Sequence, residues 1–163
     1  MTDKPKVYLF TDGSCGAGED IGAWTALLAT SQDRQLLYGV VNPTTISRME
    51  LIPIIEGLIW LRNNWAMFLK DVHVGIYSDS EYVIKTMSGM YEPHKNMDLW
   101  TAFGLVSKDF KLSFTWYERN KLAYMEACDS TCSTMRLALK DTANKLFGNY
   151  KKSADSLLYA ELP

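Results

Sequence analysis

The sequence predicts a single α/β domain around a five-stranded mixed sheet, with three antiparallel strands followed by parallel strands and helices on both faces. Three observations predict it. The first quarter of the chain alternates short β-rich runs with turn residues, two later β-rich runs follow helical patterns, and a long helical pattern comes last. A chain of 163 residues fits one compact domain. We expect residues 1–147 to form an α/β domain and residues 148–163 to form a C-terminal tail.

Each element follows from the spacing of its apolar residues. Short β-rich runs predict strands, and apolar residues at helical spacing predict helices. The expected strands are 7–11, 23–30, 36–41, 72–78 and 111–117, and the expected helices are 44–64, 81–88, 98–110 and 124–147. Since a helix precedes the fourth strand, we expect that strand to run parallel to the first.

Two local signals refine the element ends. The turn-forming run 12–14 (Asp-Gly-Ser) predicts that the first strand ends at residue 11. Ser47 and Glu50 have the spacing of a capping box, which predicts that Glu50 lies in the first turn of its helix.

Composition narrows the class of protein. The formal net charge of -2 argues against a strongly basic nucleic-acid binder, so a polyanion must be held by local contacts or bridging cations. The first six residues are polar, and no stretch is long enough to span a bilayer, so we expect a cytoplasmic protein with no membrane partner. The three cysteines are then reduced thiols. Cys128 and Cys132 lack further soft ligands nearby, so we expect core residues rather than a zinc site.

Four acidic residues are candidates for a metal site. Asp12 and Asp79 each follow one of two strands expected to be neighbours, and ligands bind at the carboxyl ends of such strands. Glu50 and Asp129 lie near helix starts. Four converging carboxylates repel each other unless divalent cations sit among them, and carboxylate oxygens suit magnesium. Taken singly, each acid is also explained by a turn, a helix cap or the helix dipole.

Five sequence blocks carry a family resemblance. They are 10–15 (FTDGSC), 44–51 (TTISRMEL), 77–83 (YSDSEYV), 96–100 (NMDLW) and 126–129 (EACD). In this order they resemble blocks of the type 1 ribonuclease H family, the bacterial ribonuclease HI-like enzymes, across roughly residues 5–147. The resemblance implies a ribonuclease H-like fold. It also implies an endonuclease that cleaves the RNA strand of RNA–DNA hybrids and leaves a 3′-hydroxyl and a 5′-phosphate.

The resemblance also implies residue roles and a cofactor. It implies two Mg²⁺ ions, for which Mn²⁺ can substitute. Asp12 would bridge the two ions, Asp79 and Asp129 would hold the ion on the nucleophile side, and Glu50 the ion on the leaving-group side. The implied substrate-binding residues are Gly13, Ser14, Cys15, Thr45 and Ser47.

The chain departs from the family pattern in three places. Ile46 and Ser47 stand where the family often has two asparagines, and the link 80–96 carries no basic helix. The segment 118–125 (ERNKLAYM) replaces a loop with glycine and histidine. Its Arg119 and Lys121 can hold a phosphate but cannot shuttle protons near neutral pH. We expect a monomer that binds RNA–DNA hybrid, and leave open that a partner protein supplies the basic surface.

Two rival functions would share the expected fold. An exonuclease of the DnaQ-like group needs Asp-x-Glu on its first strand, and residues 12–14 lack that glutamate. A catalytically weak or inactive protein of this fold, kept for nucleic-acid binding or for structure, stays open. The missing loop, the missing asparagines and the acidic charge favour it, whereas the presence of all four acids argues against it.

Overall fold

The structure is a computed structural model that describes residues 6–18, 20–65, 72–119 and 121–147. Its strands are β1 (Val7–Cys15), β2 (Gly22–Ala29), β3 (Arg34–Val41), β4 (His73–Ser78) and β5 (Lys111–Trp116). Its helices are α1 (Ile46–Asn64), α2 (Glu81–Met87), α3 (Met97–Val106) and α4 (Ala123–Phe147), with a 3₁₀ turn, η2 (Ser107–Asp109), after α3. The expected tail, 148–163, lies outside the described residues.

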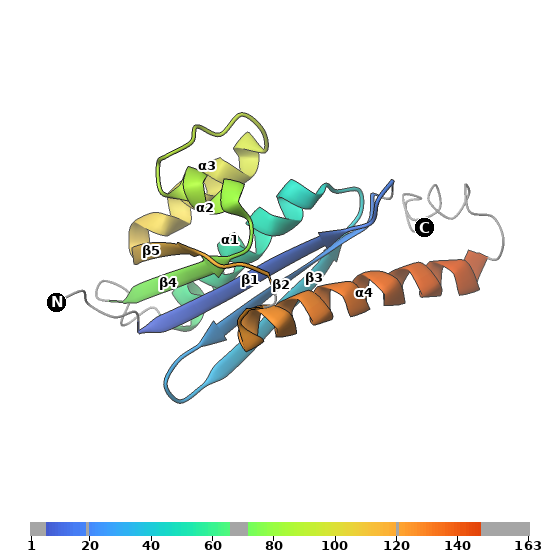
Figure 1. Cartoon of the computed structure of the whole chain (residues 1–163), viewed down its shortest axis with the longest axis horizontal. Coiled ribbons are helices and arrows are strands. Elements are labelled where there is room, and N and C mark those ends of the chain that lie inside the picture. Colours follow the sequence, from blue (N-terminus) through green and yellow to red (C-terminus); the bar gives the residue numbers. More distant parts are fainter. Residues whose placement is uncertain (1–5, 19, 66–71, 120, 148–163) are drawn as a thin grey trace.

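The strands form one five-stranded sheet in the order β3-β2-β1-β4-β5. β1, β2 and β3 pair antiparallel, whereas β4 runs parallel to β1 and β5 parallel to β4. α1 packs against β1 and β2 on one face, and α4 crosses the same strands on the other (Figure 1). This arrangement confirms the predicted fold class.

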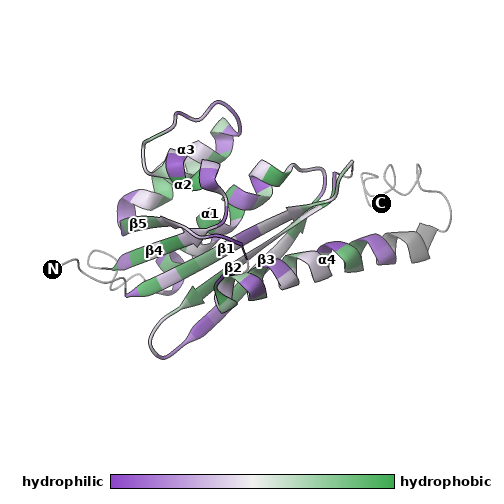
Figure 2. Ribbon diagram, in the orientation of Figure 1, coloured by the Kyte–Doolittle hydropathy of each residue, from purple (hydrophilic) through white to green (hydrophobic). Residues whose placement is uncertain are grey.

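The main core lies between the sheet and α1. Leu9, Ile54, Leu58 and Ile76 are fully buried there, and each such side chain contributes about 1.5–3 kcal/mol relative to an exposed one. Figure 2 shows hydrophobic residues along β1 and β4 and hydrophilic residues at the tip of the β2–β3 hairpin. Within the described ranges, no helix is long and apolar enough to cross a bilayer.

β1 is longer than the sequence predicted, and this sets the position of Asp12. The run 12–14 does not end the strand, because antiparallel pairing with β2 continues to Cys15 opposite Gly22. Parallel pairing with β4, in contrast, stops at Thr11 opposite Ser78. Asp12 is therefore inside a strand, one position beyond the end of the β4 ladder.

The predicted capping box at the start of α1 is wrong. The N-cap is Thr45, no side chain caps the helix, and Glu50 lies beyond the first turn. The Glu50 side chain instead accepts a hydrogen bond from Ser80, which precedes α2. The contact with Ser80 thus replaces the hydrogen bond that the Glu50 carboxylate would have made in a capping box. Asp129 likewise lies in the second turn of α4.

Two thiols fasten α4 to β1. The Sγ of Cys128 donates to the Phe10 carbonyl at 3.7 Å, and the Sγ of Cys132 donates to the Asp12 carbonyl at 3.4 Å. Both cysteines are fully buried. Burial raises the pKa of Cys132 to about 12 and raises that of Cys128 as well, so both stay protonated. Neither is in a disulfide, and the prediction of core residues is confirmed.

Candidate active site

Asp12 is the most buried of the four candidate acids. Only 3% of its surface is exposed, and neither carboxylate oxygen has a hydrogen-bond partner among the described residues. Burial, and then the charges of Asp79 and Asp129, raise the pKa of Asp12 to about 7, while the backbone N–H of Gly13 and the charge of Arg119 oppose the rise. The anionic form of this side chain is therefore costly unless a cation comes close.

Gly13 brings β1 into backbone contact with α1. A Cβ atom at Gly13 would lie 2.4 Å from the carbonyl carbon of Met49 and 2.7 Å from the backbone nitrogen of Glu50. Real Cβ atoms essentially never come so close, so only glycine fits here without a shift of the backbone. This contact places the helix residue Glu50 against the strand that carries Asp12.

Glu50 is tied to the end of β4 through Ser80. The Glu50 Oε2 accepts a hydrogen bond from the Ser80 hydroxyl at 2.7 Å. Burial raises the pKa of Glu50, and the charge of Asp79 adds to the rise, while the bond from Ser80 opposes it. The Ser80 oxygen also accepts from the backbone N–H of Val83, so the same serine caps α2.

Asp79 is paired with an arginine. The Nε of Arg119 donates to the Asp79 Oδ2 at 2.8 Å, and the indole N–H of Trp116 donates to the Asp79 carbonyl at 3.0 Å. The Arg119 side chain is 58% exposed and that of Asp79 is 11% exposed. The bond to Asp79 raises the pKa of Arg119, and the charges of Asp12 and Asp129 contribute. Arg119 is thus a positive charge within range of several acids.

The four acids share one region but are not drawn together into a coordinating set. The charge of Asp129, on α4, raises the pKa of Asp12, and that of Asp79 raises the pKa of both Asp12 and Glu50. Among the described residues, however, no three His, Cys, Asp or Glu side chains are close enough to hold one metal ion. Asp79 is instead bonded to Arg119, and Glu50 to Ser80.

The donor set nevertheless fits a hard divalent cation. Two buried carboxylate oxygens of Asp12 lack partners, and all four candidate ligands are carboxylates. Magnesium prefers such oxygen ligands and binds through one or two carboxylates together with waters and substrate phosphate. An approaching cation would also remove the repulsion that raises the pKa of Asp12.

The implied substrate-binding residues lie at the end of β1 and at the start of α1. Gly13, Ser14 and Cys15 form the last positions of β1, and the Ser14 hydroxyl accepts from the Arg136 Nε at 3.2 Å. Thr45 and Ser47 lie at the start of α1, where Thr45 is exposed and Ser47 half-buried. Both groups flank the contact between β1 and α1, but no described feature assigns them to a substrate.

Several residues of the site were not predicted from the sequence. Ser80 directly follows Asp79 and precedes a helical pattern, which is the signal of an N-cap and the only clue to its contact with Glu50. Trp116 and Arg136 carry no local signal. Arg119 was expected to hold phosphate, and it pairs with Asp79, while Lys121 pairs with Glu118.

Comparison with known proteins places this geometry in a family. The family model described as RNase H matches residues 4–130. The ribonuclease H of Cupriavidus metallidurans is 32% identical over 124 residues, covering 68% of this chain and 81% of that protein. The ribonuclease H of Nitrosospira multiformis is 32% identical over 123 residues, covering 68% and 75%.

Solved structures agree with the fold. The N-terminal RNase H domain of a Mycobacterium tuberculosis protein superimposes with a TM-score of 0.73 at 16% identity, covering 86% of this chain and 99% of that chain. LC11-RNase H1, solved in complex with an RNA/DNA hybrid, gives a TM-score of 0.69 at 18% identity, covering 79% and 95%. Because the family model spans well over half of the sequence, the chain belongs to the ribonuclease H family and is a ribonuclease H enzyme.

Proposed function

We propose that the chain hydrolyses the RNA strand of RNA–DNA hybrids with two divalent cations held by Asp12, Glu50, Asp79 and Asp129. The products would be a 3′-hydroxyl and a 5′-phosphate. The observation that carries the proposal is the Asp12 carboxylate, whose two buried oxygens have no described partner while two other acids raise its pKa. The structural neighbour bound to an RNA/DNA hybrid supports the choice of substrate.

Each acid would have its own part in holding the ions. Magnesium, or manganese in its place, supplies the positive charge that activates the attacking water and stabilises the departing 3′-oxygen. Asp12 would contact both ions, as the family resemblance implies. Asp79 and Asp129 would serve the nucleophile side, and Glu50 the leaving-group side.

Arg119 would change its partner from Asp79 to a substrate phosphate when the metal and the substrate bind. The Arg119 guanidinium competes with a cation for the Asp79 Oδ2, to which it is now bonded, and a bound cation would weaken that bond. The released guanidinium keeps its charge near neutral pH and can donate hydrogen bonds to a substrate phosphate. Arg119 would therefore balance the acids in the free enzyme and contact the nucleic acid in the complex.

A second candidate function has its own observation. Among the described residues, no three His, Cys, Asp or Glu side chains lie close enough to hold a metal ion, and Arg119 is bonded to Asp79. An RNase H-fold protein that binds nucleic acid without cutting it would look similar. In that case the Arg119–Asp79 pair would persist when magnesium is added.

One assay separates the two functions. Labelled RNA–DNA hybrid, duplex DNA, duplex RNA and single strands are incubated with magnesium, with manganese, or with a chelator. We expect cleavage of the hybrid alone, only with metal, and its loss in Asp12→Asn. Asp109→Asn is the matched control, because this exposed aspartate is not one of the four acids and forms a 3.9 Å ion pair with Arg62. No cleavage of hybrid with either metal would favour the binding protein.

A further inference from the structure

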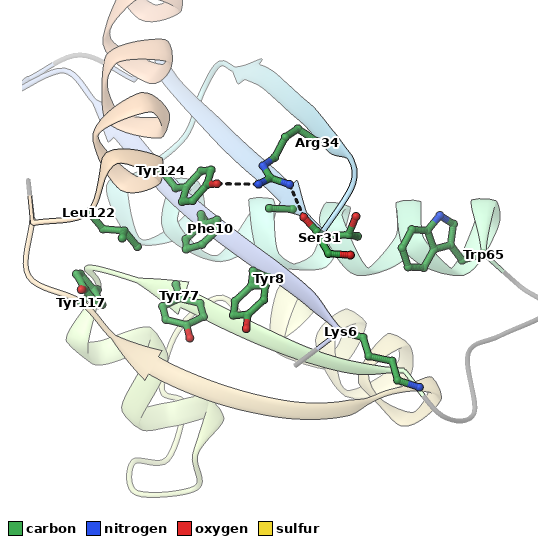
Figure 3. Close-up of a pocket in the computed structure, with 12 residues that line it drawn as sticks. Lys6, Tyr8, Phe10, Ser31, Arg34, Trp65, Tyr77, Tyr117, Leu122 and Tyr124 are labelled. Carbon is green, nitrogen blue, oxygen red and sulfur yellow. Dashed lines mark hydrogen bonds between the residues drawn. The ribbon is translucent and has the colours of Figure 1, made fainter. Parts of the chain in front are cut away.

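A large groove lies on the α4 side of the sheet, beside the carboxylate region. Its volume is about 860 Å³, within the range of small-molecule sites. Five aromatic side chains from β1, β4, the segment after β5 and the start of α4 line it, and Trp65 closes one end (Figure 3). The five are Tyr8, Phe10, Tyr77, Tyr117 and Tyr124. We call this feature the aromatic groove.

The aromatic rings form a continuous surface because of strand register. Tyr8 and Phe10 alternate along β1 and so point to the same face, and Tyr77 pairs with Phe10 across the parallel ladder. The ring centroids of Phe10 and Tyr124 are 4.7 Å apart, those of Phe10 and Tyr77 5.1 Å, and those of Tyr77 and Tyr117 6.2 Å. The four tyrosines are only half-buried, so their outer surfaces stay accessible.

The charge of the groove is positive in a chain whose net charge is -2. Lys6 and Arg34 are the only charged side chains among the described residues that line it. The Arg34 Nη2 donates to the Tyr124 hydroxyl at 2.8 Å, and its guanidinium lies 5.3 Å from the centre of that ring, which fixes it at the rim. The neighbouring Asp33 does not line the groove; its carboxylate accepts from the backbone N–H of Arg34.

Flat aromatic surfaces with a positive rim suit single-stranded nucleic acid. Each base that stacks on an aromatic side chain contributes about 1–3 kcal/mol, and cations hold the phosphates between the bases. Open sheets that carry such aromatics stack about two or three bases. An apolar peptide would gain nothing from the two cations, so charge complementarity favours the nucleic acid.

Two of the four acids lie on, or directly after, strands that also line the groove. Asp12 follows Phe10 by two residues on β1, Asp79 follows Tyr77 by two, and Arg119 follows Tyr117 by two. Two residues of a β-strand span roughly 7 Å. A DNA strand that leaves the acids can therefore reach the groove past the start of α4. The RNA strand is cut at the acids and its fragment must leave, whereas the DNA strand stays continuous.

We propose that the aromatic groove binds a single-stranded DNA extension of the hybrid, about two or three nucleotides long. This inference rests on the proposed function for the position of the hybrid, but the groove's affinity for single-stranded DNA does not. The extension would hold the enzyme on the DNA strand after the RNA is cut. Its phosphates would lie near Lys6 and Arg34, and its bases on Tyr8 and Tyr77.

The test compares substrates that differ only in their flanks. Fluorescence anisotropy, in calcium to limit cleavage, measures the affinity for a blunt hybrid, for hybrids with a DNA or an RNA overhang, and for the free DNA oligonucleotide. We expect a DNA overhang to tighten binding about tenfold, the effect of one stacked base. Tyr8→Ser should abolish the gain and Lys6→Gln should reduce it. Tyr38→Ser and Lys108→Gln, which change an exposed tyrosine and a lysine outside the groove, should keep it.

Each outcome decides the matter. An equal affinity for blunt and DNA-tailed hybrids would overturn the groove assignment, and so would a gain with RNA overhangs alone. Concentration-dependent dimerisation that Tyr8→Ser removes, without oligonucleotide binding, would assign the groove to a second copy of the chain. Cleavage of the blunt hybrid by the wild-type enzyme is scored separately, so failure of the proposed function is recognised independently. If circular dichroism shows that Tyr8→Ser does not fold, the affinity of Lys6→Gln for the DNA-tailed hybrid still tests the proposal, because Lys6 is exposed.

Discussion

The contact between Gly13 and α1, which lies beside Asp12 and Glu50, and the ion pair between Asp79 and Arg119 are built in different ways. In the first, β1 and α1 meet backbone to backbone at Gly13, and the acids are positioned by packing. In the second, an exposed arginine from the segment before α4 bonds an aspartate at the end of β4. Packing fixes a position, whereas an ion pair whose arginine is exposed can exchange that partner for another. One half of the site is therefore rigid, and the other half can rearrange when a cation or phosphate arrives.

The largest effect is expected from Gly13→Ala. The new methyl group would meet the backbone of Met49 and Glu50, which cannot move aside as a flexible side chain would. We expect a loss of about 3 kcal/mol in the free energy of unfolding, at the upper end of the usual cost of overpacking, together with loss of cleavage. Chemical denaturation measures the first. Gly104→Ala is the control, because open space surrounds that helical glycine, and it should be neutral or slightly stabilising. Wild-type stability of Gly13→Ala would show that packing does not fix this half.

The second effect concerns Asp12 and pH. Since its pKa in the folded protein is raised to about 7, its favourable contribution to stability is present below the unfolded pKa, near 4, and is lost as the pH rises through 7. In metal-free buffer, Asp12→Asn should therefore raise the free energy of unfolding at pH 8 by roughly 2–4 kcal/mol, and much less at pH 5. Denaturation curves at both values test it, with Asp109→Asn as the control. A gain that is the same at both pH values would mean that ionisation of Asp12 does not oppose folding.

The fold was largely predictable from the sequence, whereas the residues at which some strands and helices begin or end were not. The period of apolar residues gave the order of strands and helices, because each element has to bury one face. The end of β1 was misplaced because Asp-Gly-Ser is a turn signal that antiparallel pairing with β2 overrides. The Ser47–Glu50 motif misled for the same kind of reason, since Ser80 competes for the carboxylate.

The two halves of the site differ in predictability as well. Asp12 and Asp79 follow from strand order, since neighbouring parallel strands bring their ends together. The Arg119–Asp79 bond joins residues that are 40 positions apart, and no periodic pattern in the sequence indicates it. The aromatic groove was also missed, because its lining comes from five separate stretches of the chain.

A third effect, on the kinetics, tests the half of the site that contains Asp79 and Arg119. The segment 118–125 contains no histidine, so we expect the steps after cleavage to be slow while the chemistry itself remains. Rapid-quench measurements should show a burst of product followed by a steady-state rate several-fold lower. Grafting a loop with glycine and histidine over 118–125 should raise the steady-state rate. Product that accumulates linearly from the first turnover, with no gain from the graft, would show that the segment is already sufficient.

The smallest effect is expected from Arg119→Gln. Removing the cation that competes for Asp79 should tighten magnesium binding by at least about 1.5- to 5-fold, because even a fully exposed ion pair contributes about 0.2–1 kcal/mol and Asp79 is only 11% exposed. Calorimetric titration of the free enzyme measures this without any turnover. Lys121→Gln removes the same charge from a residue paired with Glu118 and should leave the affinity unchanged. Equal shifts in both variants would mean that only net charge matters.

The central claim is that Asp12 and its neighbours hold the divalent cations of catalysis. Its most direct test is anomalous diffraction from crystals of the wild-type enzyme soaked in manganese. The account predicts an anomalous peak within bonding distance of the Asp12 carboxylate, with Asp79 turned from Arg119 toward the ion. A crystal saturated with manganese that shows no peak at Asp12, and an intact Arg119–Asp79 bond, would contradict it.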